Sequence, residues 1–351
     1  MSDFKPLQLW DACSSGNLDL VKELVGTGTG AGGDDDDSFV NVNWVGSKNH
    51  DTLLHHACRH QQVEVARFLL GHPNIQVNAA NKNWATPFLV VCHNGNMELA
   101  KLFLADPRVL VNVKQIQGAN PFYMACAEGQ MEVVSLLLKD MRIDINTPSD
   151  YRSTPIWAAV REGHIELVRL ILVSGRHVDI KTKTSPWCSW GNTTPAEVGR
   201  YIKKRIRYAN ETEEEYTTST RNGPLIADLL DDYEAHPTAI RQQLRERPEL
   251  RDPFISDLFS LIIFLCDDLL TFTQNTKLPL FTPPFFAIFT DTATNKMVRF
   301  FHMAQKLPME LQMMLCNRAF GSMKDFVSTQ HSEPAFRHLA KSLLTESSST
   351  N

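Results

Sequence analysis

The sequence lacks a long uninterrupted apolar segment. Its longest apolar run, from Leu258 to Cys266, contains Ser260 and ends at Asp267-Asp268. A membrane-spanning helix needs about 20 apolar residues, so we interpret this run as a buried helix. The first ten residues, MSDFKPLQLW, have no apolar core of the kind found in signal peptides. We therefore expect neither export nor a membrane partner.

An excess of positive charge and an even number of cysteines are also missing. Lysine and arginine number 35 against 40 aspartates and glutamates, which gives a net charge of -5 and no general attraction to nucleic acid. Seven cysteines without an export signal indicate reduced thiols. We predict a cytoplasmic location, with a nuclear one as the alternative because of the short basic cluster Lys203-Lys204-Arg205.

What the first half does contain is a pattern that recurs with a constant period. Pairs of small or apolar residues lie 34 residues apart, at Ala57-Cys58, Val91-Cys92, Ala125-Cys126 and Ala159-Val160. A turn-like pair precedes each of them, at positions 52–53, 86–87, 120–121 and 154–155. An apolar segment follows each of them: VEVARFLL, MELAKLFL, MEVVSLLL and IELVRLIL. A divergent earlier copy has Ala12-Cys13 followed by LDLVKELV.

Each copy is predicted to form two helices. Proline is tolerated in the first helical turn, where its missing N–H is not needed. Small residues allow neighbouring helices to pack closely. Glycine at positions 95, 129 and 163 ends the first helix, and Gln61 takes its place in one copy. No single copy can bury its own apolar face, so the copies must stack.

This pattern resembles the ankyrin repeat, whose consensus is T-P-L-H-x-A followed by a G-H-x-E-apolar-V helix. The resemblance covers roughly residues 5–205 and implies an all-α solenoid of helix-turn-helix repeats, about five with a partial sixth opened by Thr194-Pro195. It departs from the consensus in an insertion at 26–37 and in a longer finger containing Trp187 and Trp190.

Beyond residue 208 the period is lost. We assign residues 1–208 to the repeat domain and the acidic, polar segment 209–221 to a linker. Residues 222–345 are predicted to form a helical C-terminal domain, because apolar residues of LIADLLDDY share one helical face. Further helix candidates are 237–247, 253–272, 291–305, 308–320 and 333–344. Residues 346–351 are predicted to be a disordered tail. The region also resembles C-terminal regions that follow ankyrin repeats in some fungal proteins, which implies no activity.

Two segments suggest a ligand at first sight. His55-His56-Ala57-Cys58-Arg59-His60 gathers possible metal ligands, but a zinc site needs four convergent ones, and no second cluster is visible. The resemblance instead implies that His55 hydrogen-bonds locally and holds the repeat turns. The glycine-rich run 26–33 lacks the Lys-Ser/Thr step of a phosphate loop, and the four aspartates that follow would repel a phosphate. We expect no metal and no cofactor.

No catalytic group is predicted either. Cys13, Cys58, Cys92 and Cys126 occupy packing positions of the repeat, whereas a nucleophile needs a stabilised thiolate. The carboxylates of Asp231-Asp232 are adjacent in sequence, so they point in different directions on a helix. We predict that the chain is not an enzyme, with an unrecognised enzyme in the C-terminal half as an alternative.

The ankyrin resemblance implies a protein-binding scaffold or adaptor that uses a concave face made of turn tips and first helices. Carried over repeat by repeat, it places partner-binding residues at both kinds of position. We predict that this set comprises Arg59, His60, Trp84, His93, Asn94, Ile116, Glu128, Tyr151, Arg161 and Glu162. The partner is expected to be another protein, and its identity and the oligomeric state stay open.

The segment Leu307-Pro308-Met309-Glu310-Leu311 supports a second alternative. Pro308 suits the first turn of a helix, and Glu310 lies where the helix dipole favours a carboxylate. The string resembles the opening of an F-box, the helical module that docks a ubiquitin-ligase adaptor. An adaptor with an F-box-like helix at 307–316 is therefore one hypothesis. A helix whose apolar stripe packs in the core is the simpler one.

Overall fold

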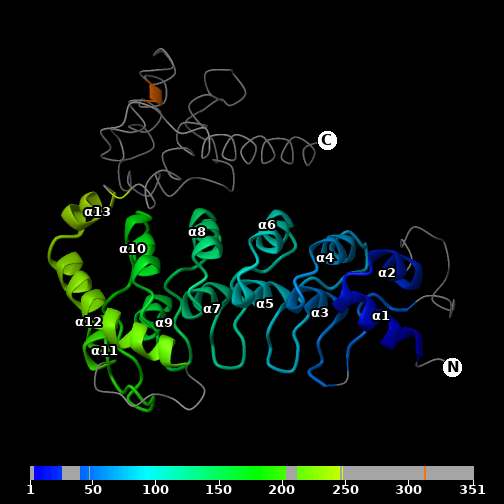
Figure 1. The fold of residues 1–351 in the computed structure, drawn as a ribbon, viewed down its shortest axis with the longest axis horizontal. Helices are drawn as coiled ribbons and strands as arrows, with labels where there is room; N and C mark the ends of the chain where they lie inside the picture. The colour runs from blue at the N-terminus through cyan, green and yellow to red at the C-terminus, as the bar shows by residue number, and fades with distance from the viewer. Residues whose placement is uncertain are drawn as a thin grey trace. The chain divides into compact units, whose positions relative to one another are not determined.

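The computed structural model describes residues 4–25, 40–46, 48–202 and 212–245, with positions 247, 312 and 313. All regular elements in these residues are helices, which confirms the all-α prediction (Figure 1). The chain divides into two compact units. The first consists of Met1–Leu137, Ile143–Glu162 and Lys181–Thr194, and the second of Leu138–Arg142, Gly163–Ile180 and Pro195–Asn351.

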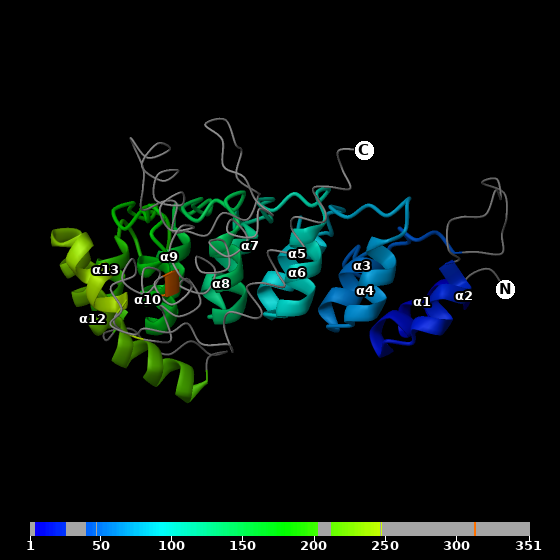
Figure 2. The ribbon, with the colours of Figure 1, turned by 90° about the horizontal axis from the view of Figure 1, so that it is seen from above.

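The first unit is built from pairs of short antiparallel helices. They are α1 (Phe4–Ser15), α2 (Leu18–Val25), α3 (Leu53–Arg59), α4 (Val63–Leu70), α5 (Pro87–Asn94), α6 (Met97–Ala105), α7 (Pro121–Ala127), α8 (Met131–Lys139) and α9 (Pro155–Glu162). The last residues of α8 belong to the second unit. The first helices α1, α3, α5, α7 and α9 pack side by side in that order, and α2, α4 and α6 form a second row (Figures 1 and 2).

The residues before the first helices act as helix caps. Thr86 and Asn120 are in extended conformation, and their side chains accept hydrogen bonds from the backbone N–H groups of Leu89 and Tyr123, at 3.3 and 2.8 Å. Such bonds satisfy donors that have no partner within the helix. The proline that follows each cap occupies the first helical turn.

Left-handed backbone ends each first helix. Gly95, Gly129 and Gly163 have φ values of 76°, 69° and 79°, a region that glycine enters without steric cost. Gln61 occupies the equivalent position with φ 56°. The repeat therefore imposes the glycine conformation on a residue that carries a Cβ.

Replacing Gln61 with glycine should stabilise the protein. A left-handed conformation costs a non-glycine residue about 1 kcal/mol, and the 3.4 Å contact from Asn96 Nδ2 to Gln61 Oε1 is exposed and weak. We expect the free energy of unfolding to rise by about 0.5–1 kcal/mol for Gln61→Gly, measured by urea denaturation. Gln61→Ala is the control and should bring no gain; an equal gain from alanine would contradict the backbone explanation.

Small and aromatic side chains fill the core of the first unit. Phe88 and Phe103 stack with ring centroids 5.9 Å apart, and the residues of the Ala-Cys step, including Ala57 and Ala125, are fully buried. Burial raises the pKa of the Cys13 thiol to about 12 and raises the pKa of the buried thiols at 58, 92 and 126 further. These thiols stay protonated at neutral pH, as expected for packing residues.

The second unit contains α10 (Ile165–Val173), α11 (Pro195–Tyr201), α12 (Glu213–Ala235) and α13 (Pro237–Arg245). Within it, α12 packs against α10 and α11, and α13 packs against α10 and α12. The guanidinium of Arg241 donates to the backbone carbonyls of Leu172 and Arg176, at 3.3 and 3.4 Å, and it lies over the ring of Tyr233. These bonds attach α13 to the end of α10.

The structure differs from the expected linker at 209–221, because α12 already begins at Glu213. Thr212 and Glu215 form a reciprocal cap: Thr212 Oγ1 accepts from the Glu215 N–H at 3.2 Å, and Glu215 Oε2 accepts from the Thr212 N–H at 2.8 Å. The acidic first turn also interacts favourably with the positive end of the helix dipole. The polar composition of this segment therefore marks a helix start, and not a loop.

The helix also continues through Asn222-Gly223-Pro224, although glycine and proline have low helix propensity. A Cβ at Gly223 would lie 2.4 Å from Ile202 Cγ2 and 2.7 Å from the Gly199 carbonyl oxygen. Only glycine therefore allows α12 to approach α11 so closely at this position. Asn222 Nδ2 donates to the Gly163 carbonyl at 2.9 Å. Packing and this bond outweigh the helix-breaking tendency of the Gly-Pro pair.

The helix candidate 237–247 corresponds to α13, whereas 253–272, 291–305, 333–344 and the tail lie outside the described residues. The same is true of the F-box-like segment 307–316, apart from positions 312 and 313. The domain boundaries, the adaptor hypothesis and the enzyme alternative therefore stay predictions. Among the helices that are described, none is long and apolar enough to cross a membrane.

Candidate binding surface

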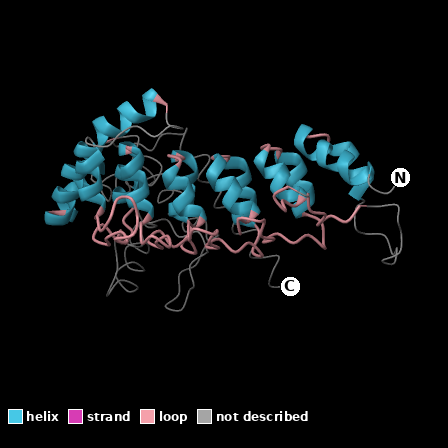
Figure 3. Cartoon of the chain, turned by 90° about the horizontal axis from the view of Figure 1, so that it is seen from below, coloured by secondary structure: helices cyan, strands magenta, loops and turns pink. Residues whose placement is uncertain are grey.

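The turns that lead into the first helices form a row of fingertips along one side of the first unit (Figure 3). We define the fingertip row as residues 48–51, 82–85, 114–119, 150–153 and 181–192. His50, Trp84, Gly118 and Arg152 lie 34 residues apart, and all have left-handed backbone, with φ between 53° and 76°. The period of the sequence is therefore also the period of the fingertips.

Backbone hydrogen bonds join each fingertip to the next. Lys82 N–H donates to Asn49 O at 2.9 Å, and Ile116 N–H donates to Asn83 O at 2.9 Å. The same link recurs from Asp150 to Gln117 at 3.1 Å and from Ser185 to Tyr151 at 2.7 Å. The fingertips thus form one continuous strip, whose spacing is set by main-chain contacts and does not depend on the side chains.

Three of the predicted partner-binding residues project from this strip into solvent. Trp84 is 63% exposed, Ile116 is 56% exposed and Tyr151 is 49% exposed. A large apolar side chain that the fold leaves uncovered is available to a partner without rearrangement. The structure places these three residues on successive fingertips.

The predicted residues on the first helices are instead held by other parts of the chain. Arg59 donates to Asp51 at 2.9 Å, and Asn81 donates to the other oxygen of the same carboxylate at 2.7 Å. The Asp51 side chain is only 5% exposed, so Arg59 neutralises a buried charge. Removing one member of such a pair is strongly destabilising.

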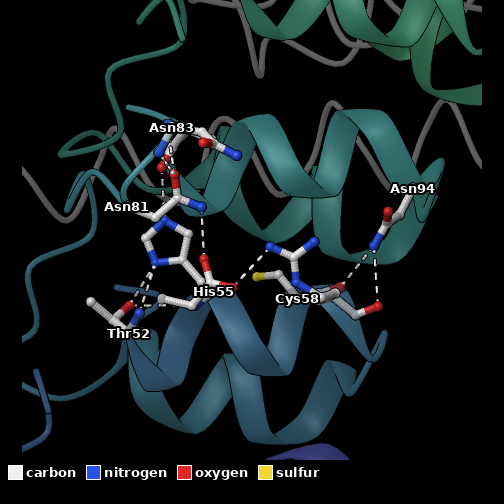
Figure 4. Close-up of polar contacts among 9 residues, drawn as sticks. Thr52, His55, Cys58, Asn81, Asn83 and Asn94 are labelled. Atoms are coloured by element: carbon white, nitrogen blue, oxygen red, sulfur yellow. Dashed lines mark hydrogen bonds and ion pairs between the residues drawn. The ribbon is translucent and has the colours of Figure 1, made fainter. Parts of the chain in front are cut away.

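Asn94 connects two neighbouring repeats (Figure 4). Its side-chain amide donates to the carbonyls of Cys58 and Arg59, at 3.4 and 3.2 Å, and thereby satisfies acceptors at the C-terminal end of α3. Gln130 makes a similar bond to the His93 carbonyl at 3.0 Å. Asn94 thus has a structural contact that sequence analysis did not anticipate.

His93 and Glu128 lie next to each other on α5 and at the end of α7, with His93 Nδ1 3.4 Å from Glu128 Oε1. The neighbouring Glu128 carboxylate raises the pKa of His93, against the effect of partial burial. Both side chains stay nearly half exposed. This pair combines a structural contact with access to solvent.

Arg161 and Glu162 form an ion pair, and the Arg161 guanidinium lies 5.7 Å above the ring of Trp157. Trp157 is buried and donates through Nε1 to Thr193 Oγ1 at 3.3 Å. The structure therefore brings Arg161 and Glu162 together at the end of α9, where Arg161 also makes a cation–π contact with the buried Trp157.

In the histidine cluster His55-His56-Ala57-Cys58-Arg59-His60, His55 holds the turns of two neighbouring repeats. The ring of His55 binds at both nitrogens: Nδ1 accepts from the Thr52 N–H at 3.2 Å, and Nε2 donates to the Ala85 carbonyl at 2.9 Å (Figure 4). These contacts tie the start of α3 to the next turn, as the resemblance implies. Within the described ranges, no group of three or more His, Cys, Asp or Glu side chains could hold a metal ion.

His60 has a neighbour that sequence analysis missed. Its ring contacts His56 edge-on, with centroids 4.5 Å apart, and His56 stacks on Trp10 of α1 at 3.7 Å. His60 itself is exposed, whereas His56 is buried. The contact to Trp10 joins the divergent first repeat to the second, over a sequence distance that no local pattern reveals.

The sequence matches the family described as ankyrin repeats (3 copies) in two overlapping segments, residues 9–109 and 88–184, which together span half of the chain. Among solved structures, one titled "Crystal Structure of EF0377 an Ankyrin Repeat Protein" is similar at 22% identity, over 61% of this chain and 94% of that chain, with a TM-score of 0.46. A search of curated proteins gives no match. Ankyrin repeats generally mediate binding between proteins. From the extent of the family match, this chain belongs to the ankyrin-repeat family.

Proposed function

We propose that the protein is a scaffold or adaptor that binds another protein through the surface formed by its fingertips and the ends of its first helices. The observation that carries the proposal is the exposure of Trp84, Ile116 and Tyr151 on successive fingertips. Aromatic side chains dominate the binding energy of protein interfaces when a partner covers them. The first-helix residues would extend the same surface, with His93, Glu128 and Arg161 half exposed beside it.

The predicted partner-binding residues differ in the contacts that they make within the chain. Trp84 and Tyr151 can be truncated without breaking an ion pair or a side-chain hydrogen bond of the described residues. Arg59 and Asn94 cannot, because Asp51 and two helix-end carbonyls depend on them. A test of binding should therefore use the fingertip residues.

The double variant Trp84→Ala/Tyr151→Ala should lose partner capture while keeping its stability. Truncating two aromatic anchors weakens binding by roughly tenfold to a hundredfold. We would compare the proteins that co-purify with tagged wild type and variant, by quantitative mass spectrometry and at matched melting temperature. Leu110→Ser is the matched control, because Leu110 is 59% exposed but lies outside the fingertip row. A double variant that captures the same partners at wild-type levels would contradict the proposal.

A further inference from the structure

The exposed apolar side chains of the fingertip row continue beyond the three predicted residues. Trp187, in the longer last finger, is 93% exposed, and its finger is joined to the preceding one by the bond from Ser185 N–H to Tyr151 O. One large apolar residue therefore projects from each of four successive fingertips. Large apolar side chains exposed at this regular spacing are candidates for contact with a partner.

The fingertip row is also positively charged, although the chain as a whole is negative. It contains six lysines and arginines but two aspartates, which gives a net charge of +4 against -5 for the whole sequence. One of these aspartates, Asp51, is buried against Arg59, so Asp150 is the exposed carboxylate of the row. Lys48 and Lys82 lie one period apart and are exposed, and neither makes an ion pair within the described residues.

The spacing of the fingertips suits an extended chain. Neighbouring helices pack about 10 Å apart, so adjacent fingertips are separated by a similar distance. An extended polypeptide in the polyproline II conformation advances about 3.1 Å per residue and has three residues per turn, so every third side chain lies on the same face. Every third residue of such a segment laid along the row would therefore reach the next fingertip. The residues between them would be available for the lysines.

We propose that the fingertip row binds an extended, acidic protein segment with an apolar residue at about every third position. Trp84, Ile116, Tyr151 and Trp187 contact the apolar residues, and Lys48, Lys82 and Arg152 pair with the carboxylates. This inference rests on the proposed function and adds the chemistry of the partner. The complementary charges steer the segment to the row, and the apolar contacts hold it there.

Single-stranded nucleic acid is the main competing occupant, because it also combines negative charge with groups that stack on aromatic rings. Ile116 offers no aromatic face for stacking. An acidic peptide fits the mixture of aliphatic and aromatic anchors better, and the oligonucleotide becomes one arm of the test.

The test measures the binding of labelled probes to the full chain by fluorescence anisotropy. The main probe is a twelve-residue peptide in which Leu-Glu-Thr is repeated four times. One control peptide carries lysine in place of glutamate, a second carries serine in place of leucine, and a third probe is an oligothymidine strand. We expect the acidic, leucine-containing peptide to bind at least about tenfold more tightly than each control. Equal binding of the basic peptide, or tighter binding of the oligonucleotide, would overturn the inference.

Two variants and one control then locate the site. Trp84→Ala/Ile116→Ser/Tyr151→Ala should weaken peptide binding at least about tenfold. Lys48→Glu/Lys82→Glu should weaken it severalfold and reduce its salt dependence. Leu110→Ser should leave it unchanged. If the triple variant binds the peptide normally while Trp84→Ala/Tyr151→Ala loses partner capture, the proposed function stands and the acidic segment is the wrong partner.

Discussion

Replacing Gly163 with alanine is expected to cost about 3–5 kcal/mol of folding stability, whereas the same change at Gly95 costs about 2 kcal/mol. The two glycines occupy equivalent repeat positions, with φ values of 79° and 76°. Both substitutions therefore bear the same left-handed strain of about 1 kcal/mol. The difference between them comes from what the new Cβ meets.

At Gly163 the new Cβ would meet rigid backbone. It would lie 2.5 Å from Ser219 Cα and 3.2 Å from the Thr218 carbonyl oxygen, both in α12. Relief requires α12 to move as a whole, which also endangers the hydrogen bond from Asn222 to the Gly163 carbonyl. Overpacking of about 1–3 kcal/mol and the loss of that bond, about 1 kcal/mol, add to the strain.

At Gly95 the new Cβ would meet the Gln130 side chain, with Oε1 at 2.0 Å. That side chain can rotate away, at the cost of its bond to the His93 carbonyl, about 1 kcal/mol. Urea unfolding of both variants checks the ranking. Adding Ser219→Gly should not rescue Gly163→Ala, because the clash is with Cα. Equal losses of folding stability at the two sites would show that α12 moves to relieve the clash as easily as the Gln130 side chain does.

The repeat could be predicted from the sequence because its signals are local and recur. Each copy carries its own cap, helix-ending residue and apolar face. A departure from the pattern in one copy therefore leaves the period visible in the others. The period also revealed Gln61 in a glycine position, and the structure places it in the glycine conformation. The start of α12 also has a local signal, because Thr212 and Glu215 have the spacing of a capping box.

Local signals failed where packing decides the outcome. Asn222-Gly223-Pro224 favours a break by propensity, but Gly223 is needed for the close approach of α12 to α11. Propensities of about 1 kcal/mol for glycine and 3 kcal/mol for proline are outweighed when a long helix buries one side against its neighbours. The location of those neighbours depends on the tertiary fold, which a single sequence does not show.

Some features of the candidate surface could be predicted from local sequence signals, and others depend on tertiary contacts. Exposure of the fingertip residues follows from their position in the turns and was predictable. The pairing of His93 with Glu128 joins positions one period and one residue apart, so it becomes visible only once the stacking direction is known. The contact of His56 with Trp10 joins the second repeat to the divergent first copy. It has no equivalent in the regular repeats from which it could be inferred.

That contact has a consequence for stability at low pH. Burial, followed by the nearby His60, lowers the pKa of His56 to about 4. Burial also lowers the pKa of His55, whose Nδ1 already accepts from the Thr52 N–H and cannot take a proton without losing that bond. Both histidines are therefore neutral in the folded state at pH values where the unfolded chain, with a histidine pKa of about 6.5, binds protons.

The sign of the effect follows from proton binding. Between pH 6.5 and about 4 the unfolded state binds more protons than the folded state, so stability falls as the pH falls. Each such group contributes up to about 1.4 kcal/mol per pH unit in this window. His93 acts in the opposite direction, because the neighbouring Glu128 carboxylate raises its pKa, and its contribution to stability is present below pH 6.5 and is lost above the raised value. Burial lowers the pKa of His72 as well. Three histidines with a lowered pKa against one half-exposed histidine with a raised pKa leave a net loss of stability on acidification.

The variant His56→Phe should reduce this loss, since a phenyl ring can keep the stacking on Trp10 and does not titrate. From pH 7.5 to pH 5, we expect the wild type to lose up to about 2 kcal/mol more than His56→Phe, as measured by urea unfolding at each pH. Any cost of fitting the phenyl ring is present at both pH values and cancels in this difference. His60→Gln is a second variant, because His60 contributes, after burial, to the lowered pKa of His56. Removing His60 should therefore reduce the loss on acidification, but by less than His56→Phe does. If His56→Phe and the wild type lose the same stability, His56 is protonated in the folded protein at pH 5, and the stacked pair with Trp10 tolerates the charge.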